Sequence, residues 1–370
     1  MKNLTKARIK VLGVGGAGCN TINHMMKSQI SGVDFIAINT DNQTLNYNLA
    51  PFKLHLGKSG LGAGAKPEIA RKNAIEQQND ILNILKNTDM LFITAGMGGG
   101  TGTGAAPIVA KLAKQLGILT VGVVCKPFAF EGKKRAKVAK EGIDELLEQV
   151  DSLIIIANDN LIKIMPQDAT IKQCFSVVDD ILKDAVNSII ELINCEGLIN
   201  VDFEDVKTIM QTKGKSMMSQ AFGCGENRAE IAAKNALSSP LLDGIDLACA
   251  KNILVNISAS KESLKIKECY QIMENLKSII NNNDEDYFIW GAVYDESLGN
   301  NLKLTIIATG LENQLYRPEV IDIIENSNII DISEVHSTKI PAVVRKRRFN
   351  EELTKQETYM PAFLKKQSQN

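Results

Sequence analysis

The chain has 370 residues, which at roughly 150 residues per domain suggests about two domains. Its apolar fraction of 44% is enough for a sizeable core and excludes intrinsic disorder of the whole chain. With 42 Lys and Arg against 43 Asp and Glu, the net charge of −1 excludes the strongly basic field that drives non-specific binding to nucleic acid.

The first half of the chain alternates apolar, strand-like runs with helical patterns. The predicted strands are Ile9–Val14, Val33–Asn39, Met90–Ala95, Ile118–Cys125 and Ser152–Ala157. The predicted helices are Ala17–Ile30, Pro67–Lys86, Ala105–Leu116 and Lys133–Gln149. Continuous apolar strands that alternate with helices are typical of a parallel sheet buried on both faces. The pattern therefore predicts an α/β fold with a Rossmann-like parallel sheet and helices on both faces.

A long helix is predicted over Ile171–Asn194, which contains neither Gly nor Pro and has apolar residues at helical spacing. At a rise of about 1.5 Å per residue it would be roughly 36 Å long. We interpret it as the connection between two domains.

The chain beyond this helix again alternates helices and strands. The predicted helices are Phe203–Thr212, Arg228–Leu237 and Leu264–Ile280, with a polar, Gly-rich stretch between the first two. The predicted strands are Asn252–Ser258, Phe288–Tyr294 and Leu302–Thr309. These elements indicate a second, α+β domain with a small sheet. From about Leu311 the pattern fades, and a flexible tail is expected.

Cysteine and histidine usage argues against covalent or metal cross-links. The seven cysteines form no C-x-x-C pair and are odd in number, and His24, His55 and His336 lie far apart. We therefore expect reduced thiols in a cytoplasmic protein and no protein metal site. No apolar run approaches about 18 residues, and no long apolar segment opens the chain, so neither a transmembrane helix nor a signal peptide is expected.

A first glycine loop lies between a predicted strand and a predicted helix. Gly13–Gly18 reads G-V-G-G-A-G and fits G-x-G-x-x-G, which favours a dinucleotide or phosphate at the helix N-terminus, although a plain tight turn fits as well. Asp34 and Asp41 follow where an NAD-binding protein has its ribose acid, so an NAD(P)-dependent oxidoreductase remains an alternative. A P-loop is excluded, because both Gly-Lys-Ser sequences have a non-glycine residue five positions earlier, Phe52 and Ile209.

A second glycine loop carries more information. Gly96–Gly104 holds six glycines and two threonines in nine residues, and it follows a buried strand. Backbone without Cβ atoms approaches a ligand closely, and successive N–H groups can form an anion nest with Thr hydroxyls as further donors. A plain turn needs far fewer glycines. With a third loop at Gly60–Ala65, the sequence predicts a site that holds a polyphosphate from several sides.

These loops carry a resemblance to a known family. Gly98–Gly104 matches the tubulin signature G-G-G-T-G-S/T-G, which is highly specific. Further matching segments are Gly15–Asn20, Asn39–Asp41, Lys126–Arg135 and Asn200–Asp205. The chain resembles the tubulin/FtsZ family of GTPases from about Ile9 to Gly310, and again at Pro361–Gln367, which is similar to the C-terminal peptide of the bacterial cell-division members.

The resemblance implies that GTP is bound and hydrolysed to GDP, with Mg²⁺ at the phosphates. It assigns nucleotide contacts to the three glycine loops and to two later segments. The implied contact residues are Gly16, Ala17, Gly18, Cys19, Asn20, Ala63, Gly64, Gly100, Thr101, Gly102, Glu131, Arg135, Phe175 and Asp179. Ala17 stands where many relatives have glycine.

The later segments would hold ribose and base. Glu131 and Arg135 match the family's ribose-contacting pair, although their spacing fits an i,i+4 salt bridge equally well. Phe175 would stack on guanine, and Asp179 would accept hydrogen bonds from N1–H and the N2 amine. From their helical spacing alone, Phe175 could equally be a core aromatic residue and Asp179 a solvated acid.

The resemblance assigns catalysis to Asp202 and Asp205, with Asn200 positioning water. From spacing alone, Asp202 is equally a good N-cap and Asp205 a first-turn acid that complements the helix dipole. In relatives this segment completes the nucleotide site of the next subunit. That implies head-to-tail filaments, the Z ring at the division site, assembly-dependent GTPase activity, and disassembly after hydrolysis. A filament-forming protein without turnover remains a second alternative.

The implied organisation is a GTP-binding domain over 1–170, a connecting helix over 171–200, a C-terminal domain over 201–310, a flexible linker over 311–356 and a partner-binding peptide over 357–370. Tyr359–Gln367 would bind membrane-anchor and regulatory division proteins such as FtsA and ZipA. The basic run Arg345–Arg348 is read either as a solvated linker segment or as a contact to an anionic surface. The implied location is the cytoplasm at midcell, beneath the inner membrane, with no nucleic-acid partner.

Overall fold

The computed structural model describes residues 7–166, 168–194, 197–199, 201–242, 247–277 and 287–311. The first part of the chain forms β1 (Ile9–Val14), α1 (Gly15–Lys27), β2 (Val33–Asn39), α2 (Asn42–Asn46), β3 (Phe52–His55), α3 (Pro67–Glu76), α4 (Gln78–Leu85), β4 (Met90–Gly96), α5 (Thr101–Gln115), β5 (Leu119–Lys126), α6 (Lys133–Gln149), β6 (Ser152–Ala157) and α7 (Asn158–Ile162). The second part forms α8 (Ile171–Asn194), β7 (Gly197–Ile199), α9 (Phe203–Met210), β8 (Lys215–Gly223), α10 (Arg228–Leu237), β9 (Asn252–Ala259), α11 (Ile266–Lys277), β10 (Tyr287–Tyr294) and β11 (Leu302–Leu311).

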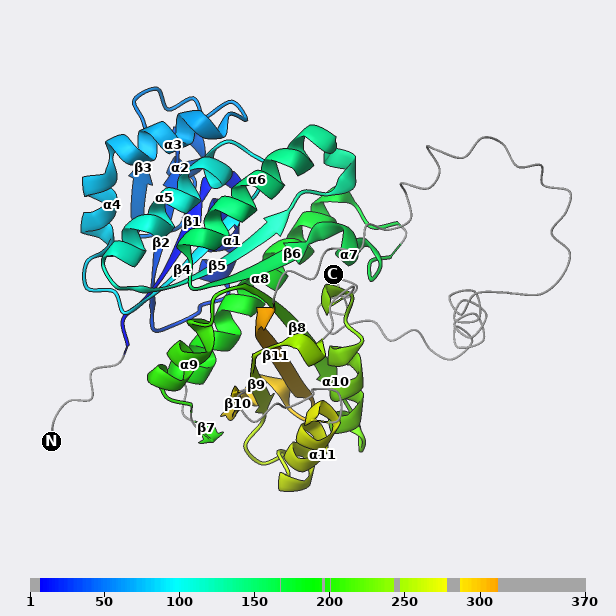
Figure 1. Cartoon of the computed structure of the whole chain (residues 1–370). Coiled ribbons are helices and arrows are strands. Elements are labelled where there is room, and N and C mark those ends of the chain that lie inside the picture. The colour runs from blue at the N-terminus through cyan, green and yellow to red at the C-terminus, as the bar shows by residue number, and fades with distance from the viewer. Residues whose placement is uncertain are drawn as a thin grey trace, which may run out of the picture. The chain divides into compact units, whose positions relative to one another are not determined.

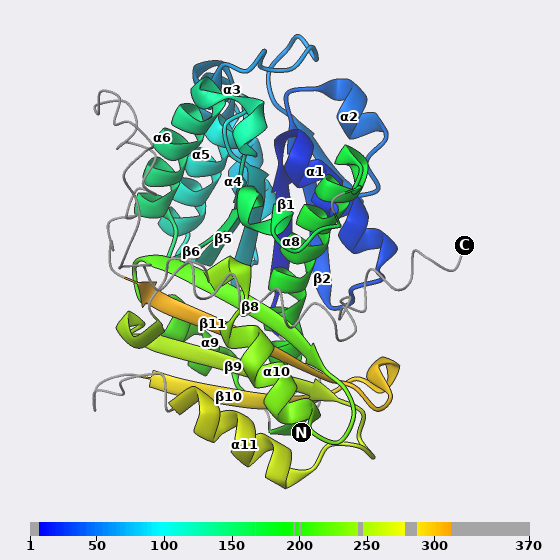
Figure 2. The ribbon, with the colours of Figure 1, turned by 90° about the vertical axis from the view of Figure 1, so that its right-hand side faces the viewer.

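The first part confirms the predicted parallel α/β sheet. Its strands lie in the order β3-β2-β1-β4-β5-β6, and all neighbours within this set are parallel. Apolar side chains of the strands pack on one face against α1 and α8, and on the other face against α3, α4, α5 and α6 (Figures 1 and 2). Burial on both faces explains why the strands are almost continuously apolar.

The second part is a mixed sheet that continues the first. β8 pairs with β6 over two residue pairs, Leu153 with Lys215 and Ile154 with Ser216, so the strands form one sheet of eleven. Helices α10 and α11 cover one face of the second part. Helix α8 covers the other face while also packing on the parallel strands, so it belongs to both halves of the structure (Figure 2). Its role as the connection between two domains stays a prediction.

Two predictions of local structure are wrong. The single helix predicted over Pro67–Lys86 is divided at Gln77, which ends α3 and precedes α4. The polar stretch predicted between α9 and α10 contains strand β8, whose Ser216 and Ser219 are buried although they are polar. Tertiary pairing with β11 and β6 satisfies the backbone of this strand, a signal that local hydrophobic pattern does not carry.

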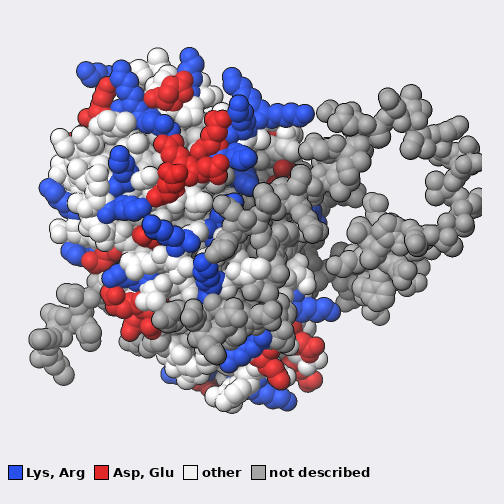
Figure 3. Space-filling model, in the orientation of Figure 1, with Lys and Arg blue, Asp and Glu red and all other residues white. Residues whose placement is uncertain are grey.

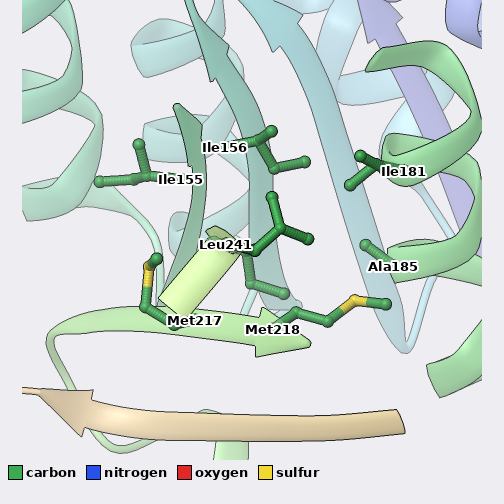
Figure 4. Close-up of a pocket in the computed structure, with 8 residues that line it drawn as sticks. Ile155, Ile156, Ile181, Ala185, Met217, Met218 and Leu241 are labelled. Atoms are coloured by element: carbon green, nitrogen blue, oxygen red, sulfur yellow. The ribbon is translucent and has the colours of Figure 1, made fainter. Parts of the chain in front are cut away.

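The seam between the two halves is apolar and almost filled. Figure 4 shows Ile156 of β6, Ile181 of α8, Met218 of β8 and Leu241 of the short turn Pro240–Leu242 around one small cavity. Its volume is about 10 Å³, which is room for one water molecule at most. The lining offers no polar side chain to hold such a water, so this cavity is a packing defect and not a ligand site. Among the described residues, no helix is both long and apolar enough to cross a membrane.

Candidate nucleotide-binding site

The three glycine loops meet at the point where the strand order reverses. β1 and β4 are neighbours, while the chain runs from β1 outward to β3 on one side and from β4 outward to β6 on the other. Helices α1 and α5 both begin at the carboxyl ends of these strands. Neither helix has a side-chain cap or an acidic residue in its first turn. Two uncompensated helix N-termini at a switch point form an anion site with free N–H donors.

The first two loops pack directly on each other. Gly15 has φ of +77°, and a Cβ there would lie 2.8 Å from the amide nitrogen of Gly102. A Cβ on Gly96 would lie 2.7 Å from the Cβ of Ala17. Side chains at these glycines would force the loops apart, so the glycines bring both helix N-termini to one place.

Other glycines of the loops face open space. A Cβ on Gly16 or Gly99 would meet no atom within 4 Å, and neither residue has a positive φ. The protein's own packing therefore does not require glycine at these positions. A cradle that a single Cβ would begin to fill fits an anionic ligand lying against the backbone.

The third loop exposes Gly64, one of its two predicted residues, together with Ala65, while the other predicted residue, Ala63, is buried. Ala63 is 5% exposed and packs against Gly100, where a Cβ would approach it to 2.8 Å. Gly64 and Ala65 are exposed, and both have φ of +57°. A left-handed backbone conformation is uncommon for alanine, and nothing in the local sequence predicts it. Ala65 is thus a candidate ligand-facing residue that the sequence reasoning missed, while Ala63 supports the loop from within.

Cys19 and Asn20 differ in their exposure. Asn20 is exposed at the start of α1, but Cys19 is fully buried, with its Sγ 3.9 Å from the side-chain nitrogen of Asn39. Burial raises the pKa of the Cys19 thiol to about 12, so the thiol stays protonated. The buried Cys19 side chain is therefore not available to a ligand.

Thr101 is joined to a residue that the sequence reasoning did not single out as a site residue. Its hydroxyl oxygen lies 2.7 Å from that of Thr40, and both side chains are buried. The backbone N–H of Thr40 donates to Oδ1 of Asn39 at 2.8 Å. The turn after β2 therefore buttresses the first turn of α5, and Thr40 links the second and third glycine loops.

The predicted base-binding residues lie on the first turns of α8. Phe175 is 42% exposed and meets the buried Phe128 edge-to-face, with ring centroids 5.4 Å apart. Asp179 accepts a hydrogen bond from the hydroxyl of Thr21 on α1 at 2.8 Å. Burial raises the pKa of Asp179, and the Thr21 hydrogen bond opposes that shift. One aromatic ring and one half-buried acid are therefore available to a planar base.

Glu131 and Arg135 form the salt bridge that their spacing allows, with 3.1 Å between Nη1 and Oε2. Glu131 also accepts from the backbone N–H of Phe128 at 2.9 Å, which ties the pair to the aromatic residues. Arg135 stays half-exposed. The salt bridge and a ribose contact are compatible, because Glu131 Oε1 and Oε2 have further lone pairs.

Helix α6 begins with Lys133, Lys134 and Arg135 and has no acid in its first turn. Cations at a helix N-terminus oppose the dipole, so this arrangement disfavours the helix unless an anion is close by. The acids of α6 lie farther along, and Figure 3 shows acidic side chains gathered over this helix between basic ones.

The predicted catalytic acids lie away from the glycine loops. Asp202 is the N-cap of α9, and its Oδ1 accepts from the backbone N–H of Asp205 at 2.8 Å. Asp205 is exposed, and among the described residues no side chain pairs with its carboxylate. α9 follows the C-terminal end of α8, whereas Phe175 and Asp179 lie near its N-terminal end (Figure 2). Asn200 lies outside the described residues.

The capping role that spacing allowed for Asp202 is therefore present. The glycine loops and the acids do not form one site within this chain. Among the described residues, no three His, Cys, Asp or Glu side chains are grouped as a metal site.

A Rossmann-type sheet with two helix N-termini at its switch point, continued by mixed strands that share a long helix with it, defines a tubulin-like GTPase. Residues 8–166 match the model of the Tubulin/FtsZ family, GTPase domain, and residues 214–312 match that of the FtsZ family, C-terminal domain. The cell division protein FtsZ of Wigglesworthia glossinidia brevipalpis is 43% identical, covering 98% of this chain and 97% of that protein. The chain belongs to the FtsZ family of cell-division proteins.

Comparison with solved structures supports the same family. An empty FtsZ dimer from M. jannaschii is 41% identical, with a TM-score of 0.79 and coverage of 84% of this chain and 90% of that one. CetZ2 from Haloferax volcanii is 18% identical with a TM-score of 0.71, which shows the shared fold alone. The expected family membership is confirmed, and with it a GTPase domain that binds guanine nucleotide.

Proposed function

We propose that this protein hydrolyses GTP at contacts between subunits that assemble head to tail into filaments, and that these filaments form the Z ring at the division site. The observation that carries the proposal is the separation of two groups along α8. The glycine loops lie at the carboxyl ends of β1 and β4, whereas α9, whose first turn holds the exposed Asp205, follows the opposite end of α8 from the one that carries Phe175 and Asp179 (Figures 1 and 2). Among the described residues, no side chain pairs with the Asp205 carboxylate. A carboxylate so placed can reach a nucleotide only on another subunit.

In this proposal the phosphates lie on backbone N–H groups of Gly16–Gly18 and Gly100–Gly102, with the α1 and α5 dipoles behind them. Gly64 and Ala65 face the terminal phosphate. Glu131 and Arg135 hold the ribose. Mg²⁺ is held by phosphate oxygens and water, since it needs few protein ligands, and it offsets phosphate charge.

The base is read by two residues of α8. The ring of Phe175 stacks on guanine, supported edge-on by Phe128. Asp179 accepts from guanine N1–H and the N2 amine, while Thr21 holds its Oδ1. A carboxylate suits this edge, because guanine presents donors there.

Asp202, Asp205 and Asn200 of the adjacent subunit orient the attacking water. Asp205 is the residue best placed for this, because Asp202 already uses one oxygen as the cap of α9. A contact between different surfaces of the same chain makes open filaments and not closed dimers. Loss of the terminal phosphate removes part of the interface, so hydrolysis favours disassembly.

The proposal extends to partners and location. Tyr359–Gln367 would bind FtsA, ZipA or similar division proteins and place the filament at midcell under the inner membrane, with many weak tethers acting together. This peptide and Arg345–Arg348 lie outside the described residues. The oxidoreductase alternative leaves the second glycine loop without a purpose, and Asp41, one of its two acids, caps α2.

Phosphate release at increasing protein concentration, with GTP and Mg²⁺, tests the shared site. We expect a threshold concentration above which activity per chain rises steeply, because the site is complete only between subunits. The measurement is inorganic phosphate released against protein concentration, with light scattering to follow assembly. Activity per chain that stays constant through the assembly threshold contradicts a site shared between subunits.

Replacing Asp179 by Asn tests the base contact. We expect GTP affinity to fall by roughly a hundredfold, because the amide places a donor against the donors of guanine. Xanthosine triphosphate should bind the variant better than GTP, since its C2 carbonyl accepts from the new amide. Competition between the two nucleotides measures this preference.

Asp180→Asn is the matched control, because that carboxylate pairs with His24 and Lys183 instead. Its base preference should equal that of the parent protein. An unchanged preference in Asp179→Asn would exclude Asp179 from the base site.

A further inference from the structure

Gln77 stands where α3 and α4 meet, and both ends of its side-chain amide are used. Its Nε2 donates to the carbonyl oxygen of His55 at 3.0 Å. Its Oε1 accepts from the backbone N–H of Gly57 at 2.6 Å. His55 ends β3, and Gly57 lies three residues before the third glycine loop (Gly60–Ala65), so one side chain from the helix break fixes the segment that leads into that loop.

The loop itself is held at two other places. Gly62 N–H donates to the carbonyl oxygen of Thr40 at 3.0 Å, and Thr40 in turn meets Thr101 through its hydroxyl. Ala63 packs against Gly100 in the second loop. Both of these anchors, Thr40 and Gly100, lie in or against segments that face the nucleotide in the proposed function. Gln77 does not lie in or against any of these segments.

The anchored loop keeps an unfavourable backbone conformation. Ala65 has φ of +57°, which an L-residue with a Cβ adopts only when its surroundings enforce it. Lys66 N–H bonds the carbonyl oxygen of Ala63 at 3.0 Å, which closes the turn around Gly64 and Ala65. If the segment that leads into the loop were released, Ala65 could relax to a negative φ, and the N–H groups of Gly64 and Ala65 would turn away.

We propose that Gln77 is a positioning residue that holds the third glycine loop for the terminal phosphate of a nucleoside triphosphate, and so sets the preference for triphosphate over diphosphate. This inference rests on the proposed nucleotide binding at the glycine loops. It also gives a reason for the break between α3 and α4, because a Gln77 inside a continuous helix would follow a different backbone path past His55 and Gly57.

The test compares affinities for GDP and for a slowly hydrolysed GTP analogue, below the assembly concentration. In Gln77→Ala the triphosphate should bind about tenfold more weakly, while GDP stays within about twofold, since a diphosphate does not reach the third loop. Gln77→Glu keeps the acceptor for Gly57 but loses the donor to His55, and should fall between the parent and Gln77→Ala. Gln78→Ala, at the exposed neighbouring position, is the matched control and should bind both nucleotides as the parent does.

If Gln77 had a purely structural role, Gln77→Ala would weaken the binding of both nucleotides equally, or would lower only the melting temperature of the protein. Equal weakening of GDP and the triphosphate, or unchanged binding of both, overturns the inference. If Gln77→Ala does not fold, the same comparison in Gln77→Glu decides. If the parent protein itself binds neither guanine nucleotide, the proposed function fails. If the parent binds both nucleotides but Gln77→Ala shows no selective loss of triphosphate binding, only the inference about Gln77 fails.

Discussion

Removing the carboxylate of Asp205 should lower GTP hydrolysis at least about a hundredfold while leaving GTP affinity unchanged. The side chain is exposed and unpaired among the described residues, and it lies on α9, which follows the C-terminal end of α8 and is separated from the glycine loops (Figure 2). In the proposed function, its loss therefore removes a group acting on water in the assembled state and none that holds the nucleotide. The measurement is phosphate release by Asp205→Ala above the assembly threshold, with nucleotide binding measured separately.

The neighbouring acid supplies a matched control. Glu204 lies in the same first turn of α9, but its carboxylate pairs with Lys207 at 3.1 Å. Glu204→Ala removes the same charge from the same turn and should hydrolyse GTP within about twofold of the parent. Normal hydrolysis by Asp205→Ala would exclude the assignment.

Asp202 needs a different substitution, because it is also a helix cap. Asp202→Asn keeps an oxygen for the N–H of Asp205 and preserves α9, so only the charge is lost. A fall in hydrolysis in Asp202→Asn with an unchanged melting temperature would separate a catalytic role from the capping role that the structure contains.

Mixing two inactive variants tests whether the acids act across the subunit contact. Gly16→Asp should fold, since Gly16 has open space around it, but its carboxylate repels phosphates. In a mixture, Asp205→Ala chains bring GTP and Gly16→Asp chains bring intact acids. We expect phosphate release above the sum of the separate activities. A mixture that equals the sum contradicts action between subunits.

Breaking the ion pair between Arg228 and Glu268 should lower the free energy of unfolding by about 3–5 kcal/mol. Arg228 is 4% exposed, and its Nε and Nη2 donate to the two oxygens of Glu268 at 2.6 and 2.9 Å. Its Nη1 also donates to the carbonyl oxygen of Asn300 at 2.8 Å. Arg228→Met leaves a buried carboxylate without a partner, which is the costly state. Denaturant unfolding at neutral pH measures the loss.

An exposed pair of the same chemistry is the control. Arg8 and Asp89 lie 3.0 Å apart with 57% and 36% of their side chains exposed, so Arg8→Met should cost below about 1 kcal/mol. The double variant Arg228→Met, Glu268→Met should recover most of the loss, because no charge is then buried alone. A small loss in Arg228→Met, equal to that of Arg8→Met, would contradict the assignment.

The same pair predicts a pH dependence. Burial alone would raise the pKa of Glu268, but hydrogen bonds from Arg228 and from the backbone N–H of Lys265 outweigh it and hold the pKa below the ordinary value of 4.5. A depressed folded-state pKa means that the stabilisation is present above the unfolded value and is lost as pH falls through the folded value. The parent should therefore lose stability below about pH 4.5 more steeply than Arg228→Met.

Local sequence determined much of the framework. Helices α6, α8 and α10 and strands β1, β2 and β6 begin and end at the residues that were predicted. Each combines a strong period or apolar run with Gly, Pro or polar residues at its ends, so nearby residues alone decide it. The specific glycine pattern likewise identified the family, because few backbones need so many residues without a Cβ.

Only the tertiary structure decided the rest. β8 is a strand because β6 and β11 satisfy its backbone, and the helix after Pro67 is interrupted at Gln77, whose amide bonds the distant chain at His55 and Gly57. Ala65 takes a left-handed conformation because its loop is anchored on both sides, and Ala63 turns inward against Gly100. The separation of Asp205 from the glycine loops depends on how α8 packs along both the parallel and the mixed parts of the sheet. Such features come from contacts between residues far apart in sequence, which a local pattern of residue types does not encode.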